Sequence, residues 1–159
     1  MRPEPWLEDS ALAYARLLAD SYQRLTGAAL LGHPAPQDDR ALAAALFAAP
    51  VPVVSHGTEA DPVFRYGNAA ALALWEMDWA GFTRLPSRRS TEDDPAVQAD
   101  RDRLLAEARA KGWTDGYRGI RVSSGGRRFR ILETVLWTVR DVSGQVHGQA
   151  ARIGRVEPV

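Results

Sequence analysis

Hydrophobic residues recur with helical spacing through the first part of the chain. Over residues 10–26 they return every three or four positions, which predicts an amphipathic helix that ends at Gly27. A second helix is predicted between Asp38, whose negative charge suits a helix N-terminus, and Pro50. We interpret residues 1–50 as an N-terminal helical extension.

The pattern then changes to short runs rich in valine and aromatic residues. Residues 51–58 and 62–68 are predicted to form two strands joined by a polar turn. Helices are predicted over residues 69–77 and about 95–110, with an irregular segment over 78–90 between them. A pair of strands is thus followed by helices before the chain returns to sheet.

The last third of the chain alternates apolar and polar residues in the manner of a sheet. Three strands are predicted, joined first by the dipeptide Gly125-Gly126 and then by a turn over residues 141–144. Because helices separate two groups of antiparallel strands, the predicted fold class is α+β. We assign residues 51–159 to one core, since no linker rich in proline, glycine and serine divides the chain.

The two predicted hairpins also determine which side chains share a face of the sheet. The Gly-Gly loop pairs Val122 with Phe129, and the second turn pairs Trp137 with Gly148. Gly148 and Ala150 leave room above the middle of the sheet. Either Trp137 fills that room, as the close packing of protein interiors favours, or a ligand occupies it.

Glu133 is the one acidic residue in an otherwise apolar row of the middle strand. The predicted register places it on one rung with Arg118 and Arg152, which lie on the two neighbouring strands. A buried carboxylate needs a partner, because an unpaired buried charge costs several kcal/mol. The sequence therefore predicts a structural ion cluster, with a ligand contact as the alternative.

The opposite face of these strands carries Leu132, Leu136 and Ile153, which makes it too apolar for free exposure to water. We expect the N-terminal helix to cover this face. Charge protects the edges of many sheets. Three arginines are accordingly expected to remain solvated at one end: Arg121, Arg128 and Arg130.

Ser55, His56, Glu59 and Asp61 lie within seven positions and contain the groups of a catalytic triad. Ser55 and His56 are adjacent on a predicted strand, so their side chains point to opposite faces. A nucleophile and its base must approach to about 2.6–3.2 Å, which this geometry prevents. A polar turn between two strands is the preferred interpretation, and no catalytic residue is assigned.

Composition narrows the remaining chemistry. The chain has 159 residues, a formal net charge of +0 and no cysteine, which excludes disulfides, thiolate catalysis and cysteinyl–flavin adducts. Zero net charge and the scarcity of aromatic residues among the arginines argue against nucleic-acid binding.

The histidines have no metal-ligand spacing, so no metal site is predicted. Without a long apolar segment or a signal peptide, we expect a cytoplasmic protein that makes no membrane contact.

Two segments of the chain resemble the MEKHLA domain family: SHGTEADPVFRYGNAAALALWEMDWAGFTRLPSRRSTE and GYRGIRVSSGGRRFRI. The resemblance covers roughly residues 10–155. It implies a PAS-like five-stranded antiparallel sheet with helices over one face. It also implies a sensory or interaction role, by analogy with PAS domains that bind flavin, haem or metabolites. Without a homeodomain or a leucine zipper, the chain resembles the short bacterial type.

The resemblance and the predicted sheet together suggest a ligand pocket beneath the irregular segment. The residues expected to line it are His56, Trp75, Trp79, Phe82, Arg88, Trp137 and Gln149. Gln149 conflicts with the predicted register, which sends its side chain to the outer face, so a pocket position for Gln149 would make that register wrong. Flavin and haem are compatible cofactors, and one histidine suffices as an axial haem ligand.

Three functions remain open at this point. The first is a sensory module that binds a small molecule and acts through protein contacts. The second is a ligand-free interaction domain, in which the N-terminal helix pairs with its counterpart in a homodimer. The third is a small α+β enzyme in which Asp61, His56 or Glu133 serves as acid or base, although the sequence shows no convergent pair.

Overall fold

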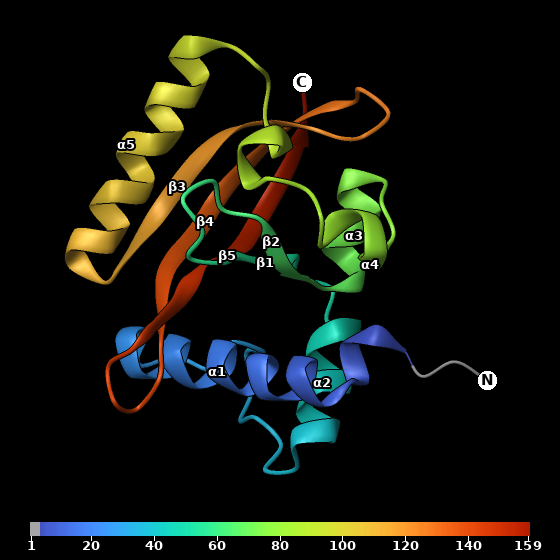
Figure 1. Ribbon diagram of the computed structural model, residues 1–159, viewed down its shortest axis with the longest axis vertical. Helices are drawn as coiled ribbons and strands as arrows, with labels where there is room; N and C mark the ends of the chain where they lie inside the picture. Colours follow the sequence, from blue (N-terminus) through green and yellow to red (C-terminus); the bar gives the residue numbers. More distant parts are fainter. Residues whose placement is uncertain (1–3) are drawn as a thin grey trace.

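A five-stranded antiparallel sheet forms the centre of the protein, as a computed structural model shows for the described residues, 4–159 (Figure 1). Its strands are β1 (Val53–His56), β2 (Phe64–Gly67), β3 (Trp113–Val122), β4 (Arg128–Arg140) and β5 (Val146–Pro158). The order across the sheet is β2-β1-β5-β4-β3, so the first and last strands of the chain are neighbours. The predicted α+β class and five antiparallel strands are confirmed, although β3 begins four residues earlier than Tyr117.

Four helices lie where the sequence predicts them, and local chemistry explains several of their ends; three short ones were not predicted, two of them within the segment 78–90 expected to be irregular. The helices are η1 (Pro5–Leu7), α1 (Asp9–Thr26), α2 (Asp39–Ala48), α3 (Ala69–Trp75), α4 (Trp79–Phe82), η2 (Ser87–Ser90) and α5 (Pro95–Lys111). Gly27 ends α1 in the left-handed conformation, with a φ of 75°. Asp38 and Asn68 cap α2 and α3, because their side-chain oxygens accept hydrogen bonds from backbone N–H groups of the first turn.

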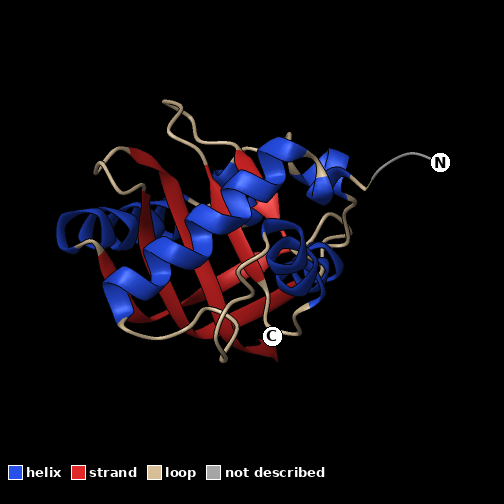
Figure 2. Cartoon of the chain, turned by 90° about the horizontal axis from the view of Figure 1, so that it is seen from below, coloured by secondary structure: helices blue, strands red, loops and turns tan. Residues whose placement is uncertain are grey.

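Helices cover both faces of the sheet (Figure 2). Helix α1 lies across the strands on one face, whereas α3, α4 and α5 pack on the other. Leu18 and Tyr22 of α1 belong to the same buried core cluster as Trp137, and the Tyr22 and Trp137 rings meet edge to face with centroids 4.9 Å apart. The N-terminal helix therefore covers one face, as predicted. Leu136 and Ile153, which we had expected beneath it, lie on the other face.

A β-bulge at Glu133 explains this exchange of faces. Glu133 adopts a positive φ of 49°, and β4 places one more residue than β3 between two successive pairs, Gly119–Ile131 and Tyr117–Thr134. An extra residue reverses the alternation of side chains along a strand. Odd-numbered residues before the bulge consequently face α5, and odd-numbered residues after it face α1.

The ion cluster predicted around Glu133 is not formed among the residues that the structure describes. The Glu133 side chain is 66% exposed, and its one ion pair is a contact of 3.9 Å to the half-exposed Arg155. Arg118 is exposed, and Arg152 donates a hydrogen bond to the Leu30 carbonyl oxygen. The prediction was wrong because it assumed regular alternation through the whole strand, which the bulge interrupts.

Both hairpin registers also differ from the prediction. The Ser123 N–H donates to the Arg127 carbonyl oxygen, so the first loop has three residues and Arg121, not Val122, pairs with Phe129. This slip of one residue turns Arg121 inward. In the second hairpin, Trp137 pairs with Ala150, two residues beyond the predicted partner.

Substitutions at Glu133 test the bulge directly. Glu133→Gln is expected to change the free energy of unfolding by less than about 0.5 kcal/mol, because an exposed pair at this distance contributes little. Glu133→Gly is expected to raise it by up to about 1 kcal/mol, since glycine adopts positive φ without steric cost. Urea unfolding followed by circular dichroism measures both values. A loss above 1 kcal/mol in Glu133→Gln would contradict the exposed position.

The N-terminal helices pack directly on the sheet. Arg16 of α1 donates to Asp39 and to two carbonyl oxygens of the loop before α2, which joins the two helices. The apolar side of α1 is buried in the same core as Trp137, so it is not free to pair with a second copy of the chain. Residues 1–3 of the expected extension lie outside the described residues, and a domain boundary near residue 50 stays a prediction.

Candidate ligand-binding site

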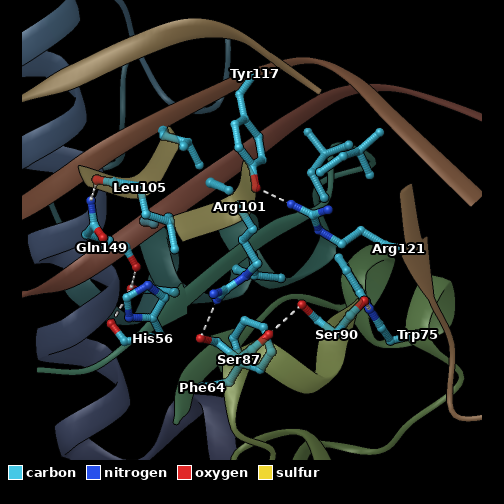
Figure 3. Close-up of a pocket in the computed structure, with 17 residues that line it drawn as sticks. His56, Phe64, Trp75, Ser87, Ser90, Arg101, Leu105, Tyr117, Arg121 and Gln149 are labelled. Carbon is cyan, nitrogen blue, oxygen red and sulfur yellow. Dashed lines mark hydrogen bonds between the residues drawn. The ribbon is translucent and has the colours of Figure 1, made fainter. Parts of the chain in front are cut away.

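A cavity of about 50 Å³ lies between the sheet and helix α5 (Figure 3). Most of its wall is apolar, and this wall is formed by side chains from the sheet, α3 and α5: Phe64, Trp75, Leu105, Ile131, Leu136 and Ile153. Polar side chains from β1, β3, β5, η2 and α5 reach the same space. Ligand sites commonly combine an apolar wall with a few convergent polar groups, and this cavity has that composition.

Arg101 projects from the middle of α5 into the cavity, and only 8% of its surface is exposed. Its Nη2 donates to the Ser87 hydroxyl at 2.6 Å. Burial is the main cause that lowers the pKa of the guanidinium, and the nearby charge of Arg121 lowers it further. The arginine remains protonated at neutral pH, so the cavity contains an unfavourably desolvated positive charge.

Arg121 brings a second guanidinium to the cavity from β3, with 6% of its surface exposed. It donates to the Tyr117 hydroxyl and to the Ile120 carbonyl oxygen. A Cβ atom at Gly119 would lie 2.8 Å from Arg121 Nη1, so the glycine leaves room for this side chain. We expected Arg121 to be solvated, and the slip in the hairpin register explains why it is buried instead.

Gln149 and His56 close the end of the cavity nearest to the α5 C-terminus. The Gln149 amide donates to the Leu105 carbonyl oxygen at 3.2 Å and accepts from Arg109 at 3.3 Å. His56 Nδ1 donates to the Gly57 carbonyl oxygen at 3.0 Å, which leaves Nε2 as a buried acceptor without a partner among the described residues. Burial lowers the pKa of His56, so its ring is neutral near pH 7.

Comparison with known proteins places this chain in a family. A family model described as MEKHLA domain matches residues 12–157, which is most of the chain. The chain belongs to the MEKHLA domain family. No curated protein sequence matches it.

Solved structures similar to this MEKHLA chain are PAS and light-oxygen-voltage domains. An RNA-binding light-oxygen-voltage receptor matches with a TM-score of 0.58 and 20% identity, over 74% of this chain and 32% of that one. A variant of the fungal photoreceptor VVD matches with a TM-score of 0.58 and 14% identity, over 87% and 93% of the two chains. A PAS domain from Colwellia psychrerythraea matches with a TM-score of 0.56 and 12% identity, over 74% and 92%. At such identities the likeness establishes the PAS-like fold alone.

Three of the seven residues expected to line a pocket reach this cavity. They are His56 on β1, Trp75 at the end of α3 and Gln149 on β5. The predicted register of the second hairpin was wrong by two residues, a shift that leaves Gln149 on the same face as Leu136; Gln149 reaches the cavity because the cavity lies on that face. Trp75 also donates its Nε1–H to the Ser90 carbonyl oxygen. Whether any of the three binds a ligand stays a prediction.

The other four expected residues lie outside the cavity. Trp137 is buried under α1 on the opposite face, because the bulge reverses its direction. Trp79 packs edge to face on Tyr66, and Phe82 stacks on Phe64 behind the cavity wall. Arg88 is half-exposed and forms an ion pair with Asp61 at 3.1 Å.

The two buried arginines were missed by the sequence interpretation, although one carried a usable signal. Arg101 lies at helical spacing between Val97 and Leu104 or Leu105, on the apolar side of α5. A charged residue in that position indicates either a buried ion or a functional site. Arg121 gave no such signal, because its inward direction depends on the hairpin register.

Neither flavin nor haem fits this cavity. Pockets that bury ligands of drug or cofactor size have volumes of roughly 300–1,000 Å³, against about 50 Å³ here. The MEKHLA chain also has no cysteine for a flavin adduct. Within the described part of the chain no three His, Asp or Glu side chains gather as a metal site, and no helix is long and apolar enough to cross a membrane.

The acid–base groups considered for an enzyme do not converge. Asp61 forms an ion pair with Arg88 at the surface. Glu133 is exposed on β4 and does not line the cavity. Ser55 points away from His56, and its hydroxyl forms a 2.7 Å hydrogen bond with Tyr14 of α1. The described residues therefore contain no acid–base pair at the cavity that involves these groups.

Proposed function

We propose that this MEKHLA chain is a sensory module that binds a small molecule in the cavity beneath α5 and acts through a protein contact. One observation carries the proposal: buried polar side chains of α5, β1, β3 and β5 converge on a mostly apolar cavity, where His56 Nε2 has no partner among the described residues and Arg101 uses one of its N–H donors on Ser87. Such groups are costly to bury in a purely structural core, and a ligand would satisfy them.

Helix α5 is the element best suited to pass on a change at this cavity. Of its 17 residues, only Arg101 and Ala108 are buried, so few contacts hold it against the sheet. A ligand that contacts Arg101 and Leu105 would add contacts to this one helix. A ligand shifts a conformational equilibrium only when it binds the two states differently, and contacts with α5 that form only when the helix is docked on the sheet would supply that difference. A protein partner that contacts the outer side of α5 would respond to that shift.

Filling the cavity tests the proposal. Ala151 lies on β5 in the cavity wall, and Ala151→Ile would occupy much of the space. The purified protein is incubated with a metabolite extract, desalted and analysed by native mass spectrometry. The wild type is expected to retain a small-molecule mass that Ala151→Ile loses. Ala106→Ile, at an exposed position of α5, serves as the control and should behave like the wild type.

Two results would contradict the proposal. Equal retention by the wild type and Ala151→Ile would place the ligand elsewhere on the protein. No retained mass in the wild type, together with a dimer at all protein concentrations, would favour the ligand-free interaction domain. The second function would then need a surface other than the apolar side of α1, which is buried against the sheet.

A further inference from the structure

The two buried guanidinium groups of the cavity have more hydrogen-bond donors than the protein uses. Each guanidinium carries five N–H donors. Among the described residues, Arg101 uses one of them on Ser87, and Arg121 uses two, on Tyr117 and Ile120. The remaining donors lie on side chains that are more than nine-tenths buried. Water or a ligand must satisfy them.

Within residues 4–159, carboxylates only weakly balance these two charges. Asp61 attracts Arg101, but it is half-exposed and forms its ion pair with Arg88. Asp102 Oδ1 lies 3.5 Å from Arg101 Nη1, but its side chain is 72% exposed and water screens the interaction. Arg121 takes part in none of the ion pairs found between residues 4 and 159. Two adjacent buried positive charges that are only weakly balanced repel each other and favour the binding of an anion.

We propose, on the basis of the function proposed above, that the cavity binds a small carboxylic acid through Arg101 and Arg121. The two oxygens of a carboxylate accept hydrogen bonds from the planar guanidinium groups, whose geometry suits them. The hydrocarbon part of the acid contacts the apolar wall, which includes Leu105, Leu136 and Ile153. A phosphate ion would satisfy the arginines but would leave that wall without a partner.

The size of the cavity limits the length of the acid. A water-sized group occupies roughly 10–15 Å³ of such a volume, so a cavity of about 50 Å³ accommodates about four of them. Covalently bonded atoms lie closer together than separate water molecules, so a short-chain acid of three or four carbons, such as propanoate or butanoate, is close to this limit. Long-chain fatty acids and aromatic acids exceed it.

Isothermal titration calorimetry on the full chain tests this assignment with four probes of matched size or charge. The probes are butanoate, butanamide, butylammonium and inorganic phosphate, at constant pH and ionic strength. Butanoate is expected to bind most tightly, because it alone combines a negative charge with a short apolar chain. The neutral amide is expected to bind at least roughly tenfold more weakly, since it loses a charge-assisted hydrogen bond.

Variants of the two arginines separate a ligand role from a structural role. Arg101→Met and Arg121→Met are each expected to weaken butanoate binding roughly tenfold to a hundredfold. Without ligand, both variants should unfold at the same temperature as the wild type or higher, because an apolar replacement removes a desolvated charge. Arg103→Met is the matched control: Arg103 lies on the exposed side of α5 and should not affect butanoate binding.

Several outcomes would overturn the carboxylate assignment. These are butanamide or phosphate binding as tightly as butanoate, no butanoate binding, or arginine variants that bind butanoate like the wild type. Loss of thermal stability in Arg101→Met without ligand would indicate a structural arginine instead. If butanamide binds as tightly as butanoate and Ala151→Ile abolishes the binding of both, the carboxylate assignment fails while a ligand-binding cavity remains.

Discussion

Replacement of Asn68 by alanine is expected to lower the free energy of unfolding by about 3–5 kcal/mol. The Asn68 side chain is fully buried and uses its complete hydrogen-bonding capacity. Its Oδ1 accepts from the N–H groups of Val53 and Ala71, and its Nδ2 donates to the carbonyl oxygens of Leu46 and Val51. The substitution would remove the Asn68 partner of these four backbone groups, of which only the Leu46 carbonyl oxygen has another hydrogen-bond partner among the described residues, and would loosen the junction of α2, β1 and α3.

Asp38→Ala provides the matched control for this prediction. Asp38 also caps a helix, but it is exposed and accepts one hydrogen bond, from the Ala41 N–H. Its loss should cost about 1 kcal/mol, the usual contribution of an N-cap. Urea unfolding followed by far-ultraviolet circular dichroism measures both variants. Equal losses for Asn68→Ala and Asp38→Ala would mean that the buried hydrogen bonds of Asn68 add nothing to its capping role.

Replacement of Trp137 by alanine is expected to cost about 3–5 kcal/mol, because it opens a cavity in the core beneath α1. Trp137 is fully buried, packs edge to face on Tyr22 and donates its Nε1–H to the Ser21 hydroxyl at 3.0 Å. Trp137→Phe preserves most of the packing and loses that hydrogen bond. Its expected cost is about 1–2 kcal/mol. Urea unfolding monitored by circular dichroism avoids the change in tryptophan fluorescence.

The phenylalanine variant also tests on which face of the sheet Trp137 lies. The sequence suggested that Trp137 lines the ligand pocket, whereas the structure places it on the opposite face, under α1. Butanoate binding by Trp137→Phe, measured in the titration described above, should therefore equal that of the wild type. A loss of binding comparable with that of Arg101→Met would contradict the position of the side chain.

Local features of the fold were predicted from the sequence, because their causes are local. The amphipathic spacing of residues 10–26 predicted α1, and Gly27 predicted where it ends. Asn68, as an N-cap, predicted the start of α3. His56 was correctly expected to point away from Ser55, because adjacent strand residues face opposite sides. The resemblance to the MEKHLA family, carried by long segments of unusual composition, is confirmed by the family match.

Features that depend on register were not predictable in the same way. A single bulge at Glu133 reverses the faces of β4, moving Leu136 to the cavity and Trp137 to the core under α1. A loop of three residues instead of two turns Arg121 inward. Each change involves one residue, yet it alters which face the side chains on the adjoining stretch of strand point to.

By itself, the sequence determined the order of helices and strands, the family and the candidate status of His56, Trp75 and Gln149. Those conclusions depend on spacing, capping chemistry and motif residues, all of which act over a few neighbouring positions. Only the tertiary structure decided that Arg101 and Arg121, twenty positions apart, meet in one cavity. The physical reason is that the direction of a side chain on a sheet depends on how the strands pair and where they bulge. Both are determined by contacts between residues that are far apart in the sequence.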